Sequence, residues 1–343
     1  MVEFWAGLCG SLPACCIVMV CVIMSNKAVN HCQLSNWGRR RLENNAAHAP
    51  SVWQTAPAKR NKVLIVGCGD VGQRLAQQIS NRIGVSLRAT ARSKPAGLLP
   101  VLPKSTRFIA CDLNQSAKRI AAFGKWVIYL APPPNTGADD PRMKHYLAAA
   151  RHVKRCVYVS TSGVYGAAAG GWVTETSPLK PTEMRGERRV AAEQRLKRSA
   201  IAHTTILRAP GIYAAQRLPL ERIRSGQPAL IAADDVPTNH IHADDLARLC
   251  WLALFKSRNR RAYNAADGQP MMHADYLQAV ALAHGLTPPA RLPIDGVKAA
   301  ISPAQWSMLA GARRVSNQRL LNEFKVRLRY ENVTAFLQTT KSV

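Results

Sequence analysis

A stretch near the start of the chain, Lys62–Ala76, narrows the folds available to this 343-residue sequence more than any other. It opens with a short apolar run, Val63–Val66, of the kind that forms a buried parallel strand. Gly67, Gly69 and Gly72 follow in the spacing G-x-G-x-x-G. A glycine turn between a strand and a helix is the context in which this motif predicts dinucleotide binding. The alternative is a tight strand-to-helix turn that binds no ligand.

The residues after the glycines predict a helix. An apolar residue recurs every four positions, as on one helical face, and Gly84 is placed to end the series Val71, Leu75, Ile79, Ile83. The three glycines would serve a tight turn, a close approach of backbone to a pyrophosphate, and close packing of helix on strand. The helix N-terminus would present unpaired N–H groups to the phosphates. We therefore expect the cofactor to contact Gly67, Gly69, Asp70, Val71 and Gly72.

From residue 62 onward, apolar strand patterns alternate with helical ones, which is typical of an α/β Rossmann fold with a doubly wound parallel sheet. The predicted strands are 63–66, 85–91, 107–111, 126–131, 156–161 and 204–208. The predicted helices include 140–152, 183–199, 243–256, 274–285, 303–310 and 316–324. We assign 61–212 to an NAD(P)-binding Rossmann domain. Residues 213–343 are expected to form a small C-terminal α/β lid that covers the substrate and is interleaved with that domain.

Residues 1–60 are expected to lie outside this fold. Residues 4–26 carry no charge, and the stretch 4–24 is long enough to span a bilayer, although Pro13 weakens it. If it inserts, Lys27 and Arg39–Arg41 would hold its C-terminal side in the cytoplasm. The alternative is a leader that takes no part in the folded protein. In both cases the predicted location of the nucleotide-binding fold is cytoplasmic, either free or anchored to the membrane.

The formal net charge of +27 predicts attraction to phosphate-bearing ligands and other polyanions. Only six of the 47 lysines and arginines precede residue 62, so the excess is spread over the folded part of the chain. No aromatic residues interleave with these cations, which argues against a nucleic-acid groove. The nine cysteines include no C-x-x-C pair, so neither a zinc site nor a redox dithiol is expected.

The usual determinant of cofactor choice lies at the end of the second strand, about 20 residues beyond the glycines. An acidic residue there binds the ribose 2′-hydroxyl and repels a 2′-phosphate, but no acid occurs from Ile83 to Cys111. We expect Arg92 and Ser93, which stand there instead, to bind the 2′-phosphate of NADP; NAD is the alternative. Asp112 and Leu113 follow the third strand, where they would meet the adenine. Asp112 would alternatively cap the helix that follows.

Several motifs occur in the order found in one known family. They are GCGDVG in the glycine turn, YVSTSGVYG at 158–166, VTETSPLKP at 173–181, ILRAPGIYA at 206–214 and HIHADDLARL at 240–249. With these motifs, the chain from about 62 to 339 resembles the extended short-chain dehydrogenase/reductase family. Within it, the chain looks like an NAD-dependent epimerase/dehydratase, and more narrowly like an atypical branch of sugar-nucleotide epimerase homologues. The segments YNAADGQP at 263–270 and RRVSNQRLL at 313–321 resemble the same branch.

The resemblance implies that a tyrosine exchanges a proton with a substrate hydroxyl while nicotinamide exchanges hydride. In the family, a lysine four residues later lowers the pKa of that tyrosine, and a Ser or Thr fixes the substrate oxygen. Thr161 stands at the Ser/Thr position with Ser160 beside it. Arg185 and Arg189, however, occupy the tyrosine and lysine positions, and no tyrosine of this chain has a lysine four residues later. Because arginine does not deprotonate in proteins, Arg185 cannot act as the base.

Tyr165 is the substitute acid/base candidate, because it follows Thr161 by four residues; its alternative role is to pack the loop after the fifth strand. Arg189 would bind ribose or phosphate. The resemblance also places Ala131, Pro132 and Pro210 in loops that line the cofactor. No metal is expected, because a buried strand followed by a helix cap at Asp244 or Asp245 accounts better for the polar series His240, His242, Asp244, Asp245.

These observations predict an NAD(P)-binding oxidoreductase or epimerase with non-standard catalytic residues. Its substrate would be a small hydroxyl-bearing molecule, such as a nucleotide sugar. The alternative is a catalytically silent regulatory protein that senses NADP(H). The expected partner is a small molecule and not nucleic acid, and a homodimer is compatible with the sequence. A membrane is a partner only if 4–24 is an anchor.

Overall fold

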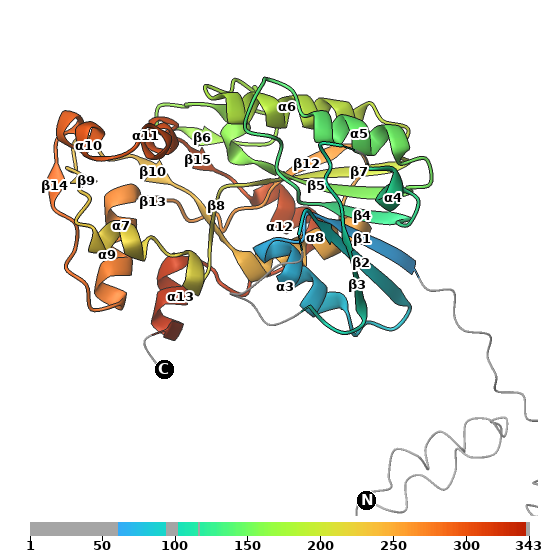
Figure 1. Cartoon of the computed structure of the whole chain (residues 1–343). Coiled ribbons are helices and arrows are strands. Elements are labelled where there is room, and N and C mark those ends of the chain that lie inside the picture. The colour runs from blue at the N-terminus through green and yellow to red at the C-terminus, as the bar shows by residue number, and fades with distance from the viewer. Residues whose placement is uncertain (1–60, 94–101, 116, 341–343) are drawn as a thin grey trace, which may run out of the picture. The chain divides into compact units, whose positions relative to one another are not determined.

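A computed structural model describes residues 61–93, 102–115 and 117–340, and its centre is a seven-stranded sheet (Figure 1). The strands are β1 (Asn61–Val66), β2 (Val85–Ala91), β3 (Thr106–Ala110), β4 (Trp126–Tyr129), β5 (Arg155–Thr161), β7 (His203–Ala209) and β12 (Arg261–Asn264). They run in the order β12-β7-β5-β4-β1-β2-β3, and every neighbouring pair is parallel. The fold is therefore the doubly wound α/β Rossmann type that the sequence predicts.

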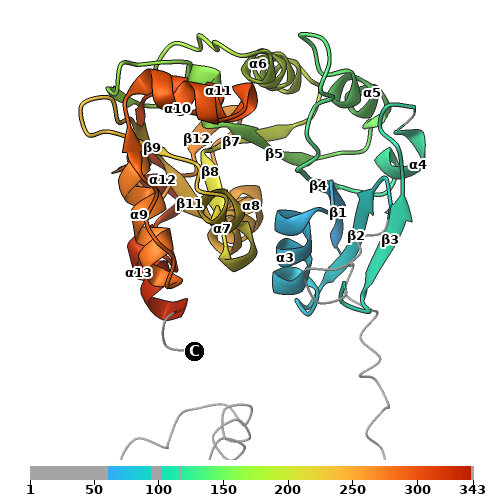
Figure 2. The same ribbon diagram turned by 60° about the vertical axis from the view of Figure 1, so that its left-hand side comes forward.

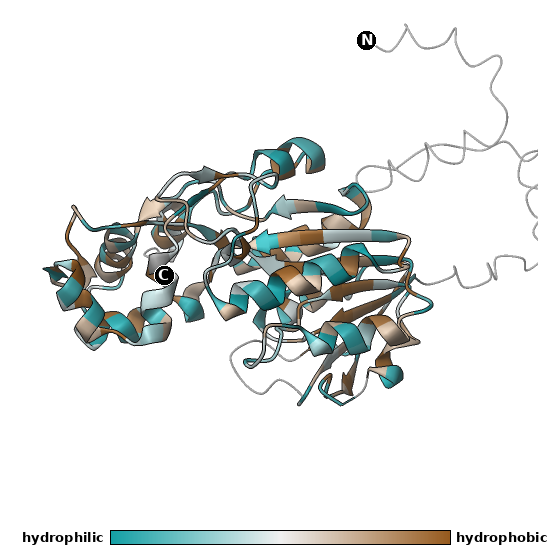
Figure 3. Cartoon of the chain, turned by 90° about the horizontal axis from the view of Figure 1, so that it is seen from above, coloured by the Kyte–Doolittle hydropathy of each residue, from teal (hydrophilic) through white to brown (hydrophobic). Residues whose placement is uncertain are grey.

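Helices cover both faces of the sheet, which explains why its strands are continuous apolar runs (Figure 2). One face packs against α3 (Asp70–Ile79), α8 (Ala243–Lys256) and α12 (Gln318–Phe324); the other packs against α4 (Lys118–Ala121), α5 (Pro141–Ala149) and α6 (Met184–Lys197). Alternate residues of β1 enter opposite cores. Val63 and Ile65 lie in the first core and Leu64 and Val66 in the second, and all four are fully buried. Figure 3 shows apolar residues concentrated along the central strands.

The order of the strands reverses at β1, which lies between β2 and β4. The chain crosses from β1 to one side for β2 and β3 and returns to the other side for β4. Loops that follow β1 and β4 therefore diverge at the carboxyl edge of the sheet. In open α/β sheets this edge is where ligands bind.

The later part of the chain adds shorter elements at one end of the sheet (Figure 1). Its helices are α7 (Leu220–Arg224), α9 (His273–Ala283), α10 (Ile294–Ala300), α11 (Pro303–Ala310) and α13 (Val333–Thr340), with a 3-10 turn at Ala215–Arg217; another 3-10 turn, Ser162–Tyr165, directly follows β5. Two-stranded pairs join β8 (Gly211–Tyr213) to β11 (His240–His242), β9 (Ala229–Leu230) to β14 (Arg291–Leu292), β10 (Pro237–Thr238) to β13 (Met271–Met272), and β6 (Trp172–Val173) to β15 (Arg314–Val315). These elements have an apolar core of their own, which includes Tyr213, Leu277 and Phe336.

Three elements differ from the expectations. Helix α3 ends at Ile79, so the predicted apolar stripe is one turn too long, and the side chain of Ile83 is fully exposed. The seventh strand, β12, was not predicted, because it is only four residues long and its partner β7 lies far back in the chain. The predicted strand 126–131 ends earlier, at Tyr129, since the N–H groups of Leu130 and Ala131 both donate to the carbonyl of Val66.

The predicted leader 1–60 and the apolar stretch 4–24 lie outside the described residues. Among the residues that are described, no helix combines the length and the apolar character needed to cross a bilayer. The division into domains at residue 212 stays a prediction.

Candidate functional site

The glycine turn joins β1 to α3 at the carboxyl edge of the sheet. Gly67 has a φ of +97°, and its N–H and that of Cys68 both donate to the carbonyl of Thr90 on β2. A Cβ on Gly67 would lie 2.4 Å from the backbone nitrogen of Ala131, which follows β4. The turn is thus held between the ends of two neighbouring strands, and only glycine fits there.

The other two glycines differ in what surrounds them. A Cβ on Gly72 would lie 2.7 Å from the carbonyl oxygen of Gly67, so this glycine lets α3 pack closely on its own turn. A Cβ on Gly69 would meet no protein atom within 4 Å. Gly69 is also the N-cap of α3 and provides no side-chain cap, so the first N–H groups of the helix have no side-chain acceptor from the cap. The geometry suits the backbone approach of a phosphate group.

Asp70 is the first residue of α3, and its carboxylate is paired twice. Oδ1 accepts from Nε of Arg74 at 2.7 Å, and Oδ2 pairs with Nη1 of Arg217 at 3.1 Å. Arg74 also pairs with Asp244 at 2.6 Å. The two arginines compensate the negative charge at the helix N-terminus, so Asp70 need not repel an anionic ligand. Val71 is half-buried and packs against the core.

The remaining predicted cofactor residues follow the neighbouring strands. Arg92 and Ser93 come directly after β2 and are exposed. Oδ1 of Asp112 accepts from the N–H of Asn114 at 3.0 Å, and Leu113 is buried. Asp112 therefore caps a turn and not α4, which begins only at Lys118.

Two further predicted residues follow β4. The N–H of Ala131 donates to the carbonyl of Val66 at 2.9 Å, which holds this loop beside the glycine turn. The carbonyl of Pro132 accepts from Nη1 of Arg142 on α5 at 2.9 Å. All the cofactor residues predicted between 67 and 132 thus lie along one edge of the sheet.

A cleft of about 250 Å³ opens beyond β5 and β7 at the same edge. Its lining includes Thr161, Arg185, Pro210, Gly211, Asn239 and Arg313. None of the three glycines of the turn lines it. The structure thus brings together Thr161 and Pro210 from the predicted set and adds side chains from the C-terminal part of the chain. We call this cavity the Thr161 cleft.

Thr161 and Ser160 end β5 but face different surroundings. Oγ1 of Thr161 accepts from the N–H of Gly163 at 3.1 Å and caps the 3-10 turn that follows. Ser160 is buried, and its hydroxyl has no hydrogen-bond partner among the described residues. Arg189 turns back to the same strand, where its Nη1 donates to Oη of Tyr158 at 3.0 Å and to the carbonyl of Val159 at 2.8 Å.

Tyr165 is buried in a polar chain away from the cleft lining. Its hydroxyl donates to Oδ1 of Asn264 at 2.6 Å and accepts from Nη1 of Arg208 at 3.0 Å. Arg208 also pairs with Glu193 of α6 at 2.7 Å, and both of these side chains are almost fully buried. Burial raises the pKa of Tyr165. These contacts favour the packing role over the acid/base role that the sequence left open beside it.

Within the described residues, no group of three or more His, Cys, Asp or Glu side chains lies together in a way that could hold a metal ion. The expected cap of α8 by Asp244 or Asp245 was wrong, because Nδ1 of His242 accepts from the N–H of Asp244 and caps the helix. Asp244 pairs with Arg74 instead. The carboxylate of Asp245 accepts from the N–H groups of Arg329 and Tyr330 and so fixes a C-terminal segment.

Asn239 and Arg313 are among the residues of the cleft that sequence reasoning missed. Asn239 accepts from the N–H of Val315 at 2.7 Å and donates to the carbonyl of Arg313 at 2.9 Å, which ties the C-terminal segment to the cleft. Nη1 of Arg313 donates to the carbonyl of Gly166 at 2.8 Å. The motif RRVSNQRLL, which contains Arg313, was the available signal, but nothing local links it to residues 150 positions earlier.

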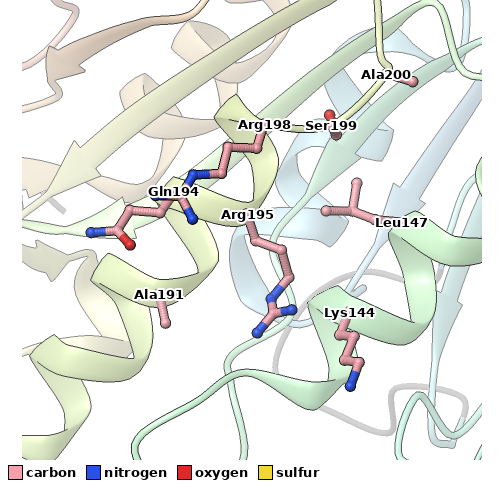
Figure 4. Close-up of a pocket in the computed structure, with 8 residues that line it drawn as sticks. All are labelled: Lys144, Leu147, Ala191, Gln194, Arg195, Arg198, Ser199 and Ala200. Atoms are coloured by element: carbon pink, nitrogen blue, oxygen red, sulfur yellow. The ribbon is translucent and has the colours of Figure 1, made fainter.

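A second pocket, of about 490 Å³, lies between α5 and α6 (Figure 4). It is lined by Lys144, Leu147, Ala191, Gln194, Arg195, Arg198, Ser199 and Ala200. Arg195 pairs with Asp139 at 2.5 Å. None of the predicted site residues lines this pocket, so we place the candidate site at the glycine turn and the Thr161 cleft.

Comparison with known proteins gives one family and many similar folds. The model of the NAD dependent epimerase/dehydratase family matches residues 63–266. No curated protein sequence gives a significant match. A functionally unknown conserved protein from Silicibacter pomeroyi is 25% identical, with a TM-score of 0.70 over 82% of this chain and 98% of its own.

Two solved enzymes share the fold at lower identity. The UDP-glucuronic acid 4-epimerase from Bacillus cereus, in complex with NAD, is 16% identical, with a TM-score of 0.64 over 82% of this chain and 96% of its own. The dTDP-glucose 4,6-dehydratase from Streptomyces venezuelae, with NAD bound, is 17% identical, with a TM-score of 0.65 over the same shares of the two chains.

Proposed function

The chain belongs to the NAD dependent epimerase/dehydratase family, and from this premise we propose that it is an NAD(P)-dependent oxidoreductase or epimerase. Its substrate would carry a hydroxyl group, as a nucleotide sugar does. The observation that carries the proposal is the open face at Gly69, where the N–H groups of α3 are uncapped at the switch point of the sheet. The solved UDP-glucuronic acid 4-epimerase and dTDP-glucose 4,6-dehydratase with this fold are both described with NAD.

We assign each part of the cofactor to the end of one strand. We assign the pyrophosphate to the turn residues Gly67–Gly72, including Asp70 and Val71. The adenosine would lie near Asp112 and Leu113, and Ala131 and Pro132 would line the path toward the Thr161 cleft. Arg189 and Pro210 would border the nicotinamide end, because Pro210 lines the cleft and Arg189 contacts the end of β5.

We favour NADP over NAD because of the exposed pair Arg92 and Ser93 after β2. A guanidinium there would pair with a 2′-phosphate, and no carboxylate occurs between Ile83 and Cys111 to repel it.

The first test is a fluorescence titration of the full chain with NADPH and with NADH. We expect NADPH to bind more tightly, and Arg92→Ala to weaken NADPH by about tenfold or more while it leaves NADH unchanged, because one charge-assisted contact is lost. Arg107→Ala is the matched control, since Arg107 is exposed at the opposite end of the neighbouring strand β3. If neither nucleotide binds, the glycine turn is only structural and the proposal fails.

In the bound state, the nicotinamide supplies the hydride acceptor or donor. Thr161 is the residue we assign to orient the substrate oxygen, because it lines the cleft, and Ser160 would support it from the buried side of the strand. Tyr165 stays a candidate for proton transfer only if its hydroxyl leaves Asn264 and Arg208.

A second candidate function is a catalytically silent sensor of NADP(H). It is favoured by the lining of the Thr161 cleft, which contains no tyrosine and has Arg185 at the position of the family's proton donor. A sensor would bind NADPH, yet the nicotinamide absorbance would not change when nucleotide sugars are added. Substrate-dependent oxidation of NADPH, or reduction of NADP⁺, would exclude this function.

A further inference from the structure

The Thr161 cleft contains two positively charged side chains that the family's mechanism does not require. Two guanidinium groups, Arg185 from the start of α6 and Arg313 from the segment before β15, line the same cavity of about 250 Å³. The side chain of Arg185 is exposed and makes no hydrogen bond and no ion pair with any described residue. Arg313 makes no ion pair with the described residues either, and its buried Nε has no hydrogen-bond partner there.

The local structure positions the backbone of Arg185 and the guanidinium group of Arg313. Gly186 lets the start of α6 pack against the turn after β5, because a Cβ there would lie 2.6 Å from Pro181 and 3.0 Å from the carbonyl of Gly163. Arg185, which precedes Gly186, lines the same cleft as Thr161. On the other side, Arg313 is fixed by the carbonyls of Gly166 and Gly311, at 2.8 and 2.6 Å from its Nη1.

The charges of the cleft are only partly compensated. Glu183, the N-cap of α6, also lines the cavity, but it forms no ion pair with either arginine. Arg185 is exposed at the mouth of the cleft, and burial together with the charge of Arg185 lowers the pKa of Arg313. The N-terminus of α6, which has no side-chain cap, adds its partial positive charge. Such cations are stabilised when an anion binds between them.

We propose that the Thr161 cleft binds an anionic group of the substrate, a carboxylate or a phosphate, between Arg185 and Arg313. The inference rests on the proposed function, because it takes this cleft to be the substrate site. It narrows the substrate class to hydroxyl compounds that carry an oxyanion close to the reacting hydroxyl. Arg185 thereby serves as an anchor at the position where the family has its proton donor.

The test is calorimetric titration of the full chain with three probes: sodium malate, a hydroxycarboxylate; inorganic phosphate; and glycerol, a neutral hydroxyl compound. We expect saturable binding of malate or phosphate and none of glycerol. Arg185→Gln should weaken the bound anion by about tenfold or more, since a charge-assisted contact is removed. Tighter binding of malate would identify a carboxylate as the anchored group, and tighter binding of phosphate a phosphorylated substrate.

The control is Arg198→Gln, which removes the same charge at the end of α6 in the pocket of Figure 4. We expect its anion affinity to stay within twofold of the unaltered protein. An equal loss of anion affinity in both variants would mean that the anion responds only to the general positive charge of the protein, and this would overturn the proposal. The absence of saturable anion binding would overturn it as well. Arg313→Gln is a second variant, but Arg185→Gln decides the matter because Arg185 makes no hydrogen bond on which folding depends.

Titration of the same variants with NADPH separates the two proposals. Unchanged NADPH affinity in Arg185→Gln with lost anion binding supports the anion cleft. Intact NADPH binding without any effect of Arg185→Gln on the anion overturns the cleft and leaves the proposed function standing. A protein that binds no dinucleotide contradicts the proposed function, whatever the anion titration gives.

Discussion

The hydroxyl of Tyr165 links three parts of the chain that are distant in sequence. Its partners, Asn264 and Arg208, lie 99 and 43 residues away, on β12 and β7. Through Arg208 the chain continues to Glu193 on α6. A buried group with this many partners stabilises the fold when complete and is costly when one member is removed. Both the structural role and the candidate catalytic role of Tyr165 therefore depend on its hydroxyl oxygen, a single atom that a substitution can remove.

We expect Tyr165→Phe to lower the free energy of unfolding by about 1–3 kcal/mol, because Asn264 and Arg208 each lose a buried partner. Urea titration measures this change. The matched control is Tyr129→Phe, since the hydroxyl of Tyr129 is buried but has no hydrogen-bond partner among the described residues. The control should be neutral or slightly stabilising. Equal effects of the two substitutions would contradict the structural role of Tyr165.

Residues that act with their sequence neighbours were predictable, and those that act across the fold were not. Gly67 and Gly72 work within six positions of each other, so the spacing alone revealed them. Thr161 was placed by a local motif and does line the cleft. Arg313 and Asn239 needed the fold to bring them there, and no periodicity or motif position marks the contact between them.

At the scale of elements, the glycine turn offers a pair of substitutions that separates folding from binding. Gly72→Ala places a Cβ 2.7 Å from the carbonyl of Gly67, so helix or turn must move, and we expect a loss of about 1–3 kcal/mol in stability. Gly69→Ala meets no protein atom and should leave stability within about 1 kcal/mol of the original.

For cofactor affinity we expect the reverse, with the larger loss in Gly69→Ala. The added methyl group at position 69 occupies the open face where a pyrophosphate would approach, so we expect Gly69→Ala to weaken NADPH by about tenfold or more. Fluorescence titration and urea unfolding of each variant give the two readouts. If Gly69→Ala binds the dinucleotide as well as the unaltered protein does, the cofactor does not lie against this turn.

The elements themselves were predicted where an apolar pattern persists. The helix 243–256 and the strand 85–91 match the structure at both ends, because each is bounded by a clear change of composition. The cap of α8 was assigned to the wrong residue, since His242 is an uncommon capping side chain beside two aspartates. Ile83 continued the apolar series by chance, after α3 had already ended.

At the scale of the whole molecule, buried titratable groups set how stability responds to pH. Asp267 is almost fully buried, Oδ1 accepts from the N–H of Gln269, and Oδ2 has no partner among the described residues. Burial raises the pKa of the Asp267 carboxyl to about 7. Between about pH 4, where an unfolded aspartate titrates, and pH 7, the folded state keeps a proton that the unfolded state loses. The contribution of Asp267 to stability therefore falls as the pH rises.

We expect the free energy of unfolding, relative to Asp267→Asn, to drop by about 2–3 kcal/mol from pH 5 to pH 8. The comparison with the Asn variant is needed because burial lowers the pKa of His240 and His242 to about 4 and of His273 to about 3. These histidines cost stability as the pH falls below about 6.5, the opposite direction. Urea titrations of both proteins at the two pH values are the measurement. A constant difference would show that Asp267 titrates normally.

The position of β12 has a consequence for synthesis of the chain. This strand is the last of the sheet to be made, yet it pairs with β7, which is translated long before it. Residues 204–207 of β7 are almost fully buried in the finished protein. During synthesis one edge of β7 stays unpaired until residue 264 has emerged from the ribosome. Helix α8 covers the same region only shortly before that. An open strand edge of this kind invites pairing with other chains. Nascent chains halted before Arg261 should consequently be the form of this protein that aggregates and that chaperones hold.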